Sequence, residues 1–181
     1  MDKFLIKGPC KIKGQVFISG SKNAALPILA STILFDKTVT IENLPRVKDI
    51  DTMINLLKSL GSKIQFFNNK KTVKITKNKN QKIYASYSLV KTMRAGILVL
   101  GPMIAKHHKS VTSLPGGCLI GARPVNYHLK ALKKLGMRYE IKKGYIHAIS
   151  KGKLEGTNIK FPKISVGATE NSIIAACLAK G

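Results

Sequence analysis

The residues with the clearest chemical potential lie between Leu114 and Pro124, in the segment LPGGCLIGARP. Cys118 stands in this segment, a short distance before Arg123. Its glycines and prolines disfavour a regular helix or strand, so we expect Cys118 on a surface loop. A nearby cation lowers the pKa of an exposed thiol and makes it reactive, and Arg123 could also bind an anion. The same segment is also typical of an ordinary turn with an incidental cysteine and a solvated arginine.

Two further basic residues stand where helices are predicted to begin. Lys22 and Asn23 follow Ser21 and open an apolar helix, where exposed backbone amides could hold a small phosphate or carboxylate, with Ser21 or Asn23 as the cap. Arg94 stands near the start of a second apolar helix, where a cation opposes the helix dipole, and this favours an anion-binding role. A plain capped helix with a solvated lysine, and an arginine that extends to solvent from a helix end, are the alternatives.

Four more residues are assigned from their places in predicted helices. Asp51 is the expected N-cap of the helix that runs through Leu60, which leaves Asp49 as the candidate charge partner for a cation. His128 falls on the helix after the glycine-rich segment, and we expect a satisfied or exposed histidine there rather than a catalytic one. Cys177 falls among apolar residues and is expected to be an inert core thiol.

The elements that must position these residues form a repeat. LKSLG at residues 57–61 returns as LKKLG at residues 132–136. Each copy is preceded by an apolar helix and a short β-branched strand and is followed by two strands. In the first unit the predicted helix covers 24–34 and the strands cover 38–41, 63–67 and 72–76. In the second unit the predicted helix covers 92–105 and the strands cover 110–113, 138–141 and 145–149. Further strands are predicted at 15–18 and 157–161, and a last helix at 168–180. The pattern indicates an α/β protein of repeated βαβαββ units whose third unit is incomplete.

The composition narrows the classes of protein further. The chain has 181 residues and a formal net charge of +24, which by itself indicates a nucleic-acid-binding protein. The lysines are scattered without a helical or aromatic-interleaved stripe, so nucleic acid is kept only as an alternative partner. No apolar run reaches the roughly 18 residues of a membrane span and no secretory signal is evident, which predicts a cytoplasmic protein without a membrane partner. The three cysteines fit neither a disulfide framework nor a zinc site, and no metal or cofactor is expected.

Taken together, these segments closely resemble the UDP-N-acetylglucosamine 1-carboxyvinyltransferase family of enolpyruvyl transferases. The resemblance is carried by residues 19–27, 89–95, 114–125 and 165–169, and it extends over the whole chain. It implies an inside-out α/β barrel, incomplete in this chain, with phosphoenolpyruvate and the nucleotide sugar bound between two domains. Residues 1–20 would be a strand segment that packs with the second domain. Residues 21–181 would be the domain with the catalytic loop, truncated in its third repeat.

The resemblance also implies a role for each candidate residue. Phosphoenolpyruvate would contact Lys22, Asn23, Arg94 and Arg123. The nucleotide sugar would contact Asn23, Arg94 and Arg123 and two short segments, namely Pro124, Val125, Asn126 and Tyr127, and then Lys163, Ile164, Ser165 and Val166. Cys118 would form an adduct with phosphoenolpyruvate and serve in general-acid chemistry or product release. Asn126 departs from the family, which commonly has an acidic residue at this position.

The implied reaction is the first committed step of peptidoglycan synthesis. The sugar 3-hydroxyl adds to C2 of phosphoenolpyruvate while C3 is protonated, and the phospholactoyl intermediate then loses phosphate. Members of the family are longer than this chain, and their carboxylate base would lie beyond Gly181. We therefore expect little activity from the chain alone. A second polypeptide that carries the missing half is a possible partner. A nucleotide-sugar-binding remnant without turnover is the other alternative.

Overall fold

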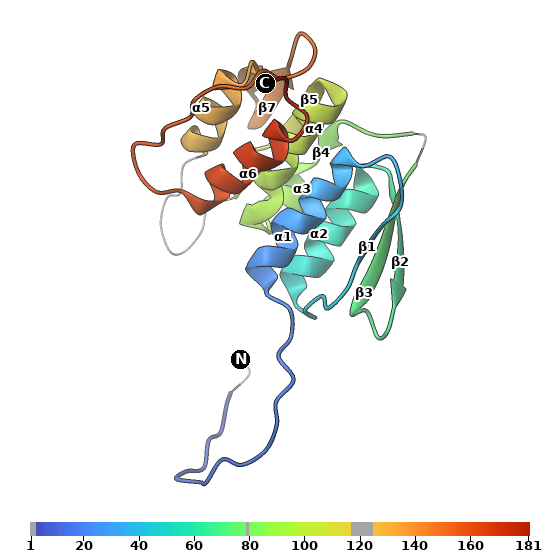
Figure 1. The fold of residues 1–181 in the computed structure, drawn as a ribbon, viewed down its shortest axis with the longest axis vertical. Helices are drawn as coiled ribbons and strands as arrows, with labels where there is room; N and C mark the ends of the chain where they lie inside the picture. Colours follow the sequence, from blue (N-terminus) through green and yellow to red (C-terminus); the bar gives the residue numbers. More distant parts are fainter. Residues whose placement is uncertain (1–2, 79, 117–124) are drawn as a thin grey trace.

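The structure is a computed structural model, and it describes residues 3–78, 80–116 and 125–181. Two α/β units follow one another along the chain (Figure 1). The first unit contains α1 (Lys22–Ser31), the 3-10 helix η1 (Thr32–Leu34), β1 (Val39–Ile41), α2 (Lys48–Ser59), β2 (Ser62–Phe67) and β3 (Thr72–Lys77). The second contains β4 (Tyr84–Ala85), α3 (Tyr87–Val90), the 3-10 helix η2 (Arg94–Val99), α4 (Leu100–His107), β5 (Lys109–Ser113), α5 (Asn126–Lys134), β6 (Arg138–Lys142) and β7 (Tyr145–Ile149). The helix α6 (Val166–Ala176) follows them.

Each unit builds one sheet, and the corresponding strands take the same order in both. The first sheet has the order β1-β3-β2, and in the second, β4-β5-β7-β6, the strands β5, β7 and β6 take the places of β1, β3 and β2. These pairs are antiparallel in both sheets, whereas β4 pairs in parallel with β5. The predicted repeat and the mixed α/β class are therefore confirmed. Within the described residues, the two sheets do not close into a barrel.

The two copies of the repeated leucine-glycine segment end corresponding helices in the same way. The C-caps of α2 and α5 are Leu60 and Leu135, and each is followed by a glycine with a left-handed backbone. The φ angles are 101° at Gly61 and 102° at Gly136. Glycine adopts this conformation without the steric cost that a Cβ would bring, so the chain leaves the helix and turns directly into β2 or β6.

The apolar side chains form two neighbouring core clusters. In the first, α1 and α2 lie side by side (Figure 1), and α2 packs against β2 of the first sheet. In the second, α4, α5 and α6 pack together against β7. Leu57 and Leu132, which occupy corresponding positions of the repeat, are fully buried in the first and second cluster respectively. Neighbouring units therefore bury each other's helices, as the repeat requires.

An ion-pair cluster on the surface also joins the two units. The Asp36 carboxylate, which follows η1, lies 2.6 Å from Lys106 Nζ on α4 and 2.8 Å from Lys77 Nζ at the end of β3. The hydrogen bonds from Lys106 and then Lys77 lower the pKa of Asp36 to about 2. The carboxylate therefore stays ionised and keeps both lysines at the boundary between the units.

Two strands predicted from the sequence are absent from the sheets. Residues 15–18 and 157–161 belong to no strand and to neither sheet among the described residues. A strand persists only where its backbone N–H and C=O groups pair with a neighbour, and these segments have no such neighbour. Residues 3–20 extend away from the body of the molecule with exposed side chains such as Phe4 and Phe17 (Figure 1). The packing of residues 1–20 with a second domain stays a prediction.

The predicted helix 92–105 is divided at its middle into η2 and α4. Pro102 lies in the first turn of α4 and has no N–H, so it cannot bond to the carbonyl of Leu98. The regular helical ladder therefore cannot run through this point. The last helix is shorter than the predicted range 168–180 and begins earlier, at Val166, with Ser165 as its N-cap.

Two residue assignments were wrong because they depend on the exact ends of helices. Asp51 lies within the first turn of α2, whose N-cap is Val47, so Asp51 is not the cap. Cys177 is exposed at the C-cap of α6, whereas it was expected in the core. Successive helical residues point in different directions, so the burial of Ile174 and Ala175 does not extend to Cys177.

Leu57→Ala and Leu132→Ala are each expected to lower the free energy of unfolding by about 2–5 kcal/mol, because each removes buried methyl groups and leaves a cavity. Urea denaturation followed by circular dichroism measures this change. The matched control is Leu5→Ala, at a fully exposed position, which should change the free energy by less than about 0.5 kcal/mol. A core variant as stable as this control would contradict the burial at its position.

Candidate functional site

A cavity of about 620 Å³ lies where several helical segments come together. The first turns of α1, α2 and α6 contribute to it, along with η2 and one residue of α5. Its lining consists of Lys22, Asn23, Leu26, Asp49, Thr92, Met93, Arg94, Ala95, Ile97, Leu98, His128, Ile164, Ser165, Val166, Gly167 and Glu170. Helix starts expose backbone N–H groups, so the cavity offers both fixed partial charges and ionised side chains.

Lys22 and Asp49 form an ion pair at this cavity. Lys22 is the first residue of α1, after the N-cap Ser21, whose hydroxyl accepts from the Ala24 N–H at 3.4 Å. Its Nζ lies 2.9 Å from Asp49 Oδ2, on the first turn of α2. Both side chains are partly exposed, so the pair adds little to stability. Its main effect is to hold the ammonium group of Lys22 beside the cavity.

Arg94 and His128 form a second group. Arg94 begins η2 and carries a positive charge into the lining, while His128 reaches the cavity from α5. Burial, and then the charge of Arg94, lower the pKa of His128 to about 4. His128 is therefore neutral at pH 7. Across the same lining, burial raises the pKa of the Glu170 carboxyl.

Most of the predicted site residues that the structure describes line this cavity. Lys22, Asn23, Asp49 and Arg94 line it, and so do Ile164, Ser165 and Val166. Lys163 precedes this segment outside the lining. Val125, Asn126 and Tyr127 are at the start of α5, next to His128, and the Tyr127 ring faces Phe161 with the centroids 6.3 Å apart. Cys118, Arg123 and Pro124 lie outside the described residues.

Sequence reasoning missed two features of this lining. His128 was expected to be satisfied or exposed, and it is indeed buried and hydrogen-bonded, yet it also borders the cavity. Glu170 was not singled out at all. Its place one turn into α6 would have indicated the lining only if the true start of that helix had been known.

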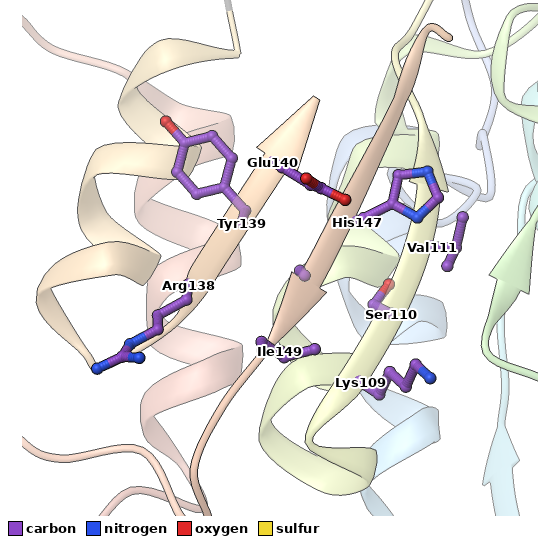
Figure 2. Close-up of a pocket in the computed structure, with 9 residues that line it drawn as sticks. Lys109, Ser110, Val111, Arg138, Tyr139, Glu140, His147 and Ile149 are labelled. Carbon is purple, nitrogen blue, oxygen red and sulfur yellow. The ribbon is translucent and has the colours of Figure 1, made fainter. Parts of the chain in front are cut away.

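A second cavity, of about 290 Å³, lies on the outer face of the second sheet (Figure 2). Glu140 and His147 occupy paired positions of β6 and β7, and Figure 2 shows their side chains next to each other. Lys109 and Arg138 lie at the other end of this lining. None of the predicted site residues that the structure describes lines this second cavity, so the larger cavity is the candidate site.

The described residues lack two other features. They contain no group of three or more His, Cys, Asp or Glu residues placed to bind a metal ion. None of their helices has both the length and the apolar character needed to cross a bilayer.

Comparison with known proteins identifies related sequences. The sequence profile of the family described as EPSP synthase (3-phosphoshikimate 1-carboxyvinyltransferase) matches residues 6–181. A curated relative from Pelagibacter ubique, named UDP-N-acetylglucosamine 1-carboxyvinyltransferase, is 64% identical over 181 residues, and a relative of the same name from Acinetobacter baylyi is 50% identical. Each alignment covers 100% of this chain and 43% of the relative, so the chain spans less than half the length of these proteins.

Solved structures support the same fold. The enolpyruvyl transferase NikO from Streptomyces tendae matches with a TM-score of 0.75 at 16% identity, over 93% of this chain and 39% of that one. An EPSP synthase from Acinetobacter baumannii matches with a TM-score of 0.70 at 17% identity, over the same shares of the two chains. These similarities confirm the predicted fold of enolpyruvyl transferases. The relatives give no support to the expectation of a second polypeptide.

The buried His128 should make stability depend on pH. As the pH falls from about 6.5 to about 4, the unfolded chain binds a proton at this ring and the folded chain does not. The free energy of unfolding should therefore decrease by about 3 kcal/mol across this window and show no further loss from His128 below it. His128→Gln should remove this part of the pH dependence in urea titrations at several pH values.

His147→Gln is the matched control for this measurement, because His147 lies on the outer face of the second sheet. It should keep the wild-type pH dependence. Equal slopes in the wild type and His128→Gln between pH 6.5 and 4 would contradict a buried neutral His128.

Proposed function

The chain belongs to the EPSP synthase family, and on this basis we propose that it carries part of a site for enolpyruvyl transfer. The reaction transfers the enolpyruvyl group of phosphoenolpyruvate to the 3-hydroxyl of UDP-N-acetylglucosamine and releases phosphate. The names of the relatives at 64% and 50% identity support UDP-N-acetylglucosamine, rather than 3-phosphoshikimate, as the acceptor. The protein would then act in peptidoglycan synthesis in the cytoplasm.

The observation that carries this proposal is the meeting of two cations at one cavity. Lys22 comes from the start of α1 and Arg94 from the start of η2, and both line the cavity of about 620 Å³. Phosphoenolpyruvate carries a phosphate and a carboxylate, and both bind well to charged N–H donors. The N-terminal turns of α1 and α6 add backbone N–H groups on the same cavity.

These groups suit the charge changes of the proposed reaction. In the addition step the sugar 3-hydroxyl loses its proton to a base, its oxygen bonds to C2 of phosphoenolpyruvate, and C3 takes up a proton from a general acid. In the elimination step C3 loses a proton, the C2–O bond to phosphate breaks, and phosphate leaves with the electron pair. Lys22 and Arg94 would stabilise the negative charge that grows on the phosphate oxygens in this second step. Asp49 would keep Lys22 in place through their 2.9 Å ion pair.

The remaining candidate residues have roles that rest on the resemblance. Cys118 would supply acid chemistry and form the adduct with phosphoenolpyruvate, and Arg123 would add a further anion contact. The segments 124–127 and 163–166 would hold the nucleotide sugar. The presence of Ile164, Ser165 and Val166 in the cavity lining supports this assignment for the second segment.

Lys22→Gln and Arg94→Gln should each weaken the binding of phosphoenolpyruvate, in the presence of UDP-N-acetylglucosamine, by roughly 10- to 100-fold. The reason is the loss of a hydrogen bond between charged partners, of about 1.5–3 kcal/mol. Isothermal titration calorimetry on the chain measures the affinity. Lys109→Gln, on the outer face of the second sheet, makes the same change in net charge and should leave the affinity within about twofold. Absence of binding of both ligands to the wild-type chain would contradict the proposed function.

Cys118 should react with electrophiles faster than Cys10 or Cys177. Cys10 and Cys177 are both exposed, so poor access of the reagent would not be the reason for their slower reaction. The expected difference in rate comes from the charges around Cys118. Arg123 follows Cys118 closely in the sequence, and the family resemblance adds Lys22 and Arg94 around the same anion site. Brief alkylation at neutral pH followed by peptide mass spectrometry gives the order of labelling. Earlier labelling of Cys10 or Cys177 would show that Cys118 is not the activated thiol.

A further inference from the structure

The buried side chain of Asn171 joins three helical elements. It lies within α6 with no exposed surface. Its Oδ1 accepts from the backbone N–H of Gly101 at 2.9 Å, at the start of α4. Its Nδ2 donates to the carbonyl of Ile97 in η2 at 3.2 Å and lies 3.1 Å from His128 Nδ1 on α5.

Two of these contacts determine which way the amide group faces. The Gly101 N–H can only donate and the Ile97 carbonyl can only accept, so Oδ1 must face the first and Nδ2 the second. It is therefore the NH₂ group of Asn171 that meets the His128 ring. An NH₂ group has no acceptor, so His128 Nδ1 must accept the hydrogen bond. The proton of the neutral ring is then on Nε2.

The other edge of the ring faces the cavity. His128 is part of the cavity lining, and its Nε2 has no hydrogen-bond partner among the described residues. Among the described residues no buried side-chain nitrogen or oxygen lacks a hydrogen-bond partner, which agrees with an Nε2 that borders the cavity. Gly167, in the first turn of α6, leaves room beside it, because even a Cβ at Gly167 would lie 3.5 Å from Nε2.

We propose that Asn171 is a positioning residue that keeps His128 in the neutral Nε2–H form, and that this N–H donates a hydrogen bond to an anionic oxygen of phosphoenolpyruvate. The second half rests on the proposed function, whereas the first half depends on the protein alone. Lys22 and Arg94 line the same cavity and bring the anion there. A neutral N–H donor would orient this anion without placing a third positive charge close to Lys22 and Arg94.

The surrounding charges agree with a neutral ring. Arg94 on η2 and burial both lower the pKa of His128, while Glu170 on α6 and the Lys22–Asp49 pair complete the charged groups of the lining. A protonated ring would also place an N–H on Nδ1 directly against the NH₂ group of Asn171. Two donors would then face each other, and one hydrogen bond would be lost.

The test uses nitrogen NMR of the chain with ¹⁵N-labelled histidine, since the ring nitrogens of the two neutral forms have different chemical shifts and couplings. At pH 7, His128 is expected to show a protonated Nε2 and an unprotonated Nδ1. Asn171→Asp should reverse this, because a carboxylate accepts a hydrogen bond and so favours the ring form that carries its proton on Nδ1. Ser172→Ala is the control. Among the described residues, the buried hydroxyl of Ser172 bonds only to the carbonyl of Ala168 in the same helix, so this variant should keep the wild-type pattern. His128→Phe assigns the signals.

A protonated Nδ1 in the wild-type chain would overturn the proposal. An unchanged His128 pattern in folded Asn171→Asp would overturn the positioning role. If Asn171→Asp does not fold, Asn171→Ser serves instead. Loss of the NH₂ donor should then produce a mixture of the two neutral forms of His128. A pure Nε2–H form in Asn171→Ser would overturn the positioning role of Asn171.

The donation is tested by adding phosphoenolpyruvate with UDP-N-acetylglucosamine, and in a separate sample inorganic phosphate. Saturating phosphoenolpyruvate should shift the Nε2 resonance of His128, and His128→Phe should weaken its binding by about tenfold or more, whereas His147→Phe should not. Inorganic phosphate that causes the same shift would assign the accepting oxygen to the phosphate, and no shift with it would assign the carboxylate. Binding without any shift at His128 would overturn the donation and leave the proposed function intact. Failure of both ligands to bind would overturn the proposed function. The tautomer of His128 in the wild-type chain would still decide whether Asn171 keeps the ring in the Nε2–H form.

Discussion

The hydrogen bonds of the buried Asn171 amide are the constraint on which the assembly of the site depends. Ile97 and Gly101 are four residues apart at the junction of η2 and α4, the spacing at which a regular helix would bond N–H to carbonyl. The Asn171 side chain bonds to both of these groups and so satisfies them at a place where the helix changes type. A Cβ at Gly101 would collide with this side chain, so glycine is required there. Through its contact with His128, the same amide also ties α5 to the junction.

The charges of the protein act on two different scales. The net charge of +24 is spread over the surface, where salt screens it and individual lysines remain solvated. At the cavity, Lys22 and Arg94 each have a specified neighbour. Asp49 holds Lys22 at 2.9 Å, and Arg94 acts on the buried ring of His128. Local geometry, rather than total charge, therefore makes this cavity suitable for a small anion.

Features that depend on neighbouring residues could be predicted from the sequence. The repeated leucine-glycine segments predicted two corresponding units, and Gly61 and Gly136 have nearly the same φ. The alternating strands that follow them were also predicted within a residue or two, because the pattern of apolar residues and the turn residues are local signals. Lys22, Asn23 and Arg94 could be singled out as candidates for the same reason, since each stands at the start of a helical segment.

Features that depend on contacts between distant segments were decided only by the tertiary structure. Residues 15–18 and 157–161 have strand-like sequences but no partner strand among the described residues, and Cys177 is exposed because of where α6 ends. The sequence by itself determined the repeated α/β units and the residue types available for anion binding. Only the folded chain brings Asn171 to His128, which is 43 residues away, and so selects the ring nitrogen that carries the proton. The physical reason is that a histidine tautomer is set by the hydrogen-bond partner of its ring, and no local pattern in the sequence specifies a partner on another helix.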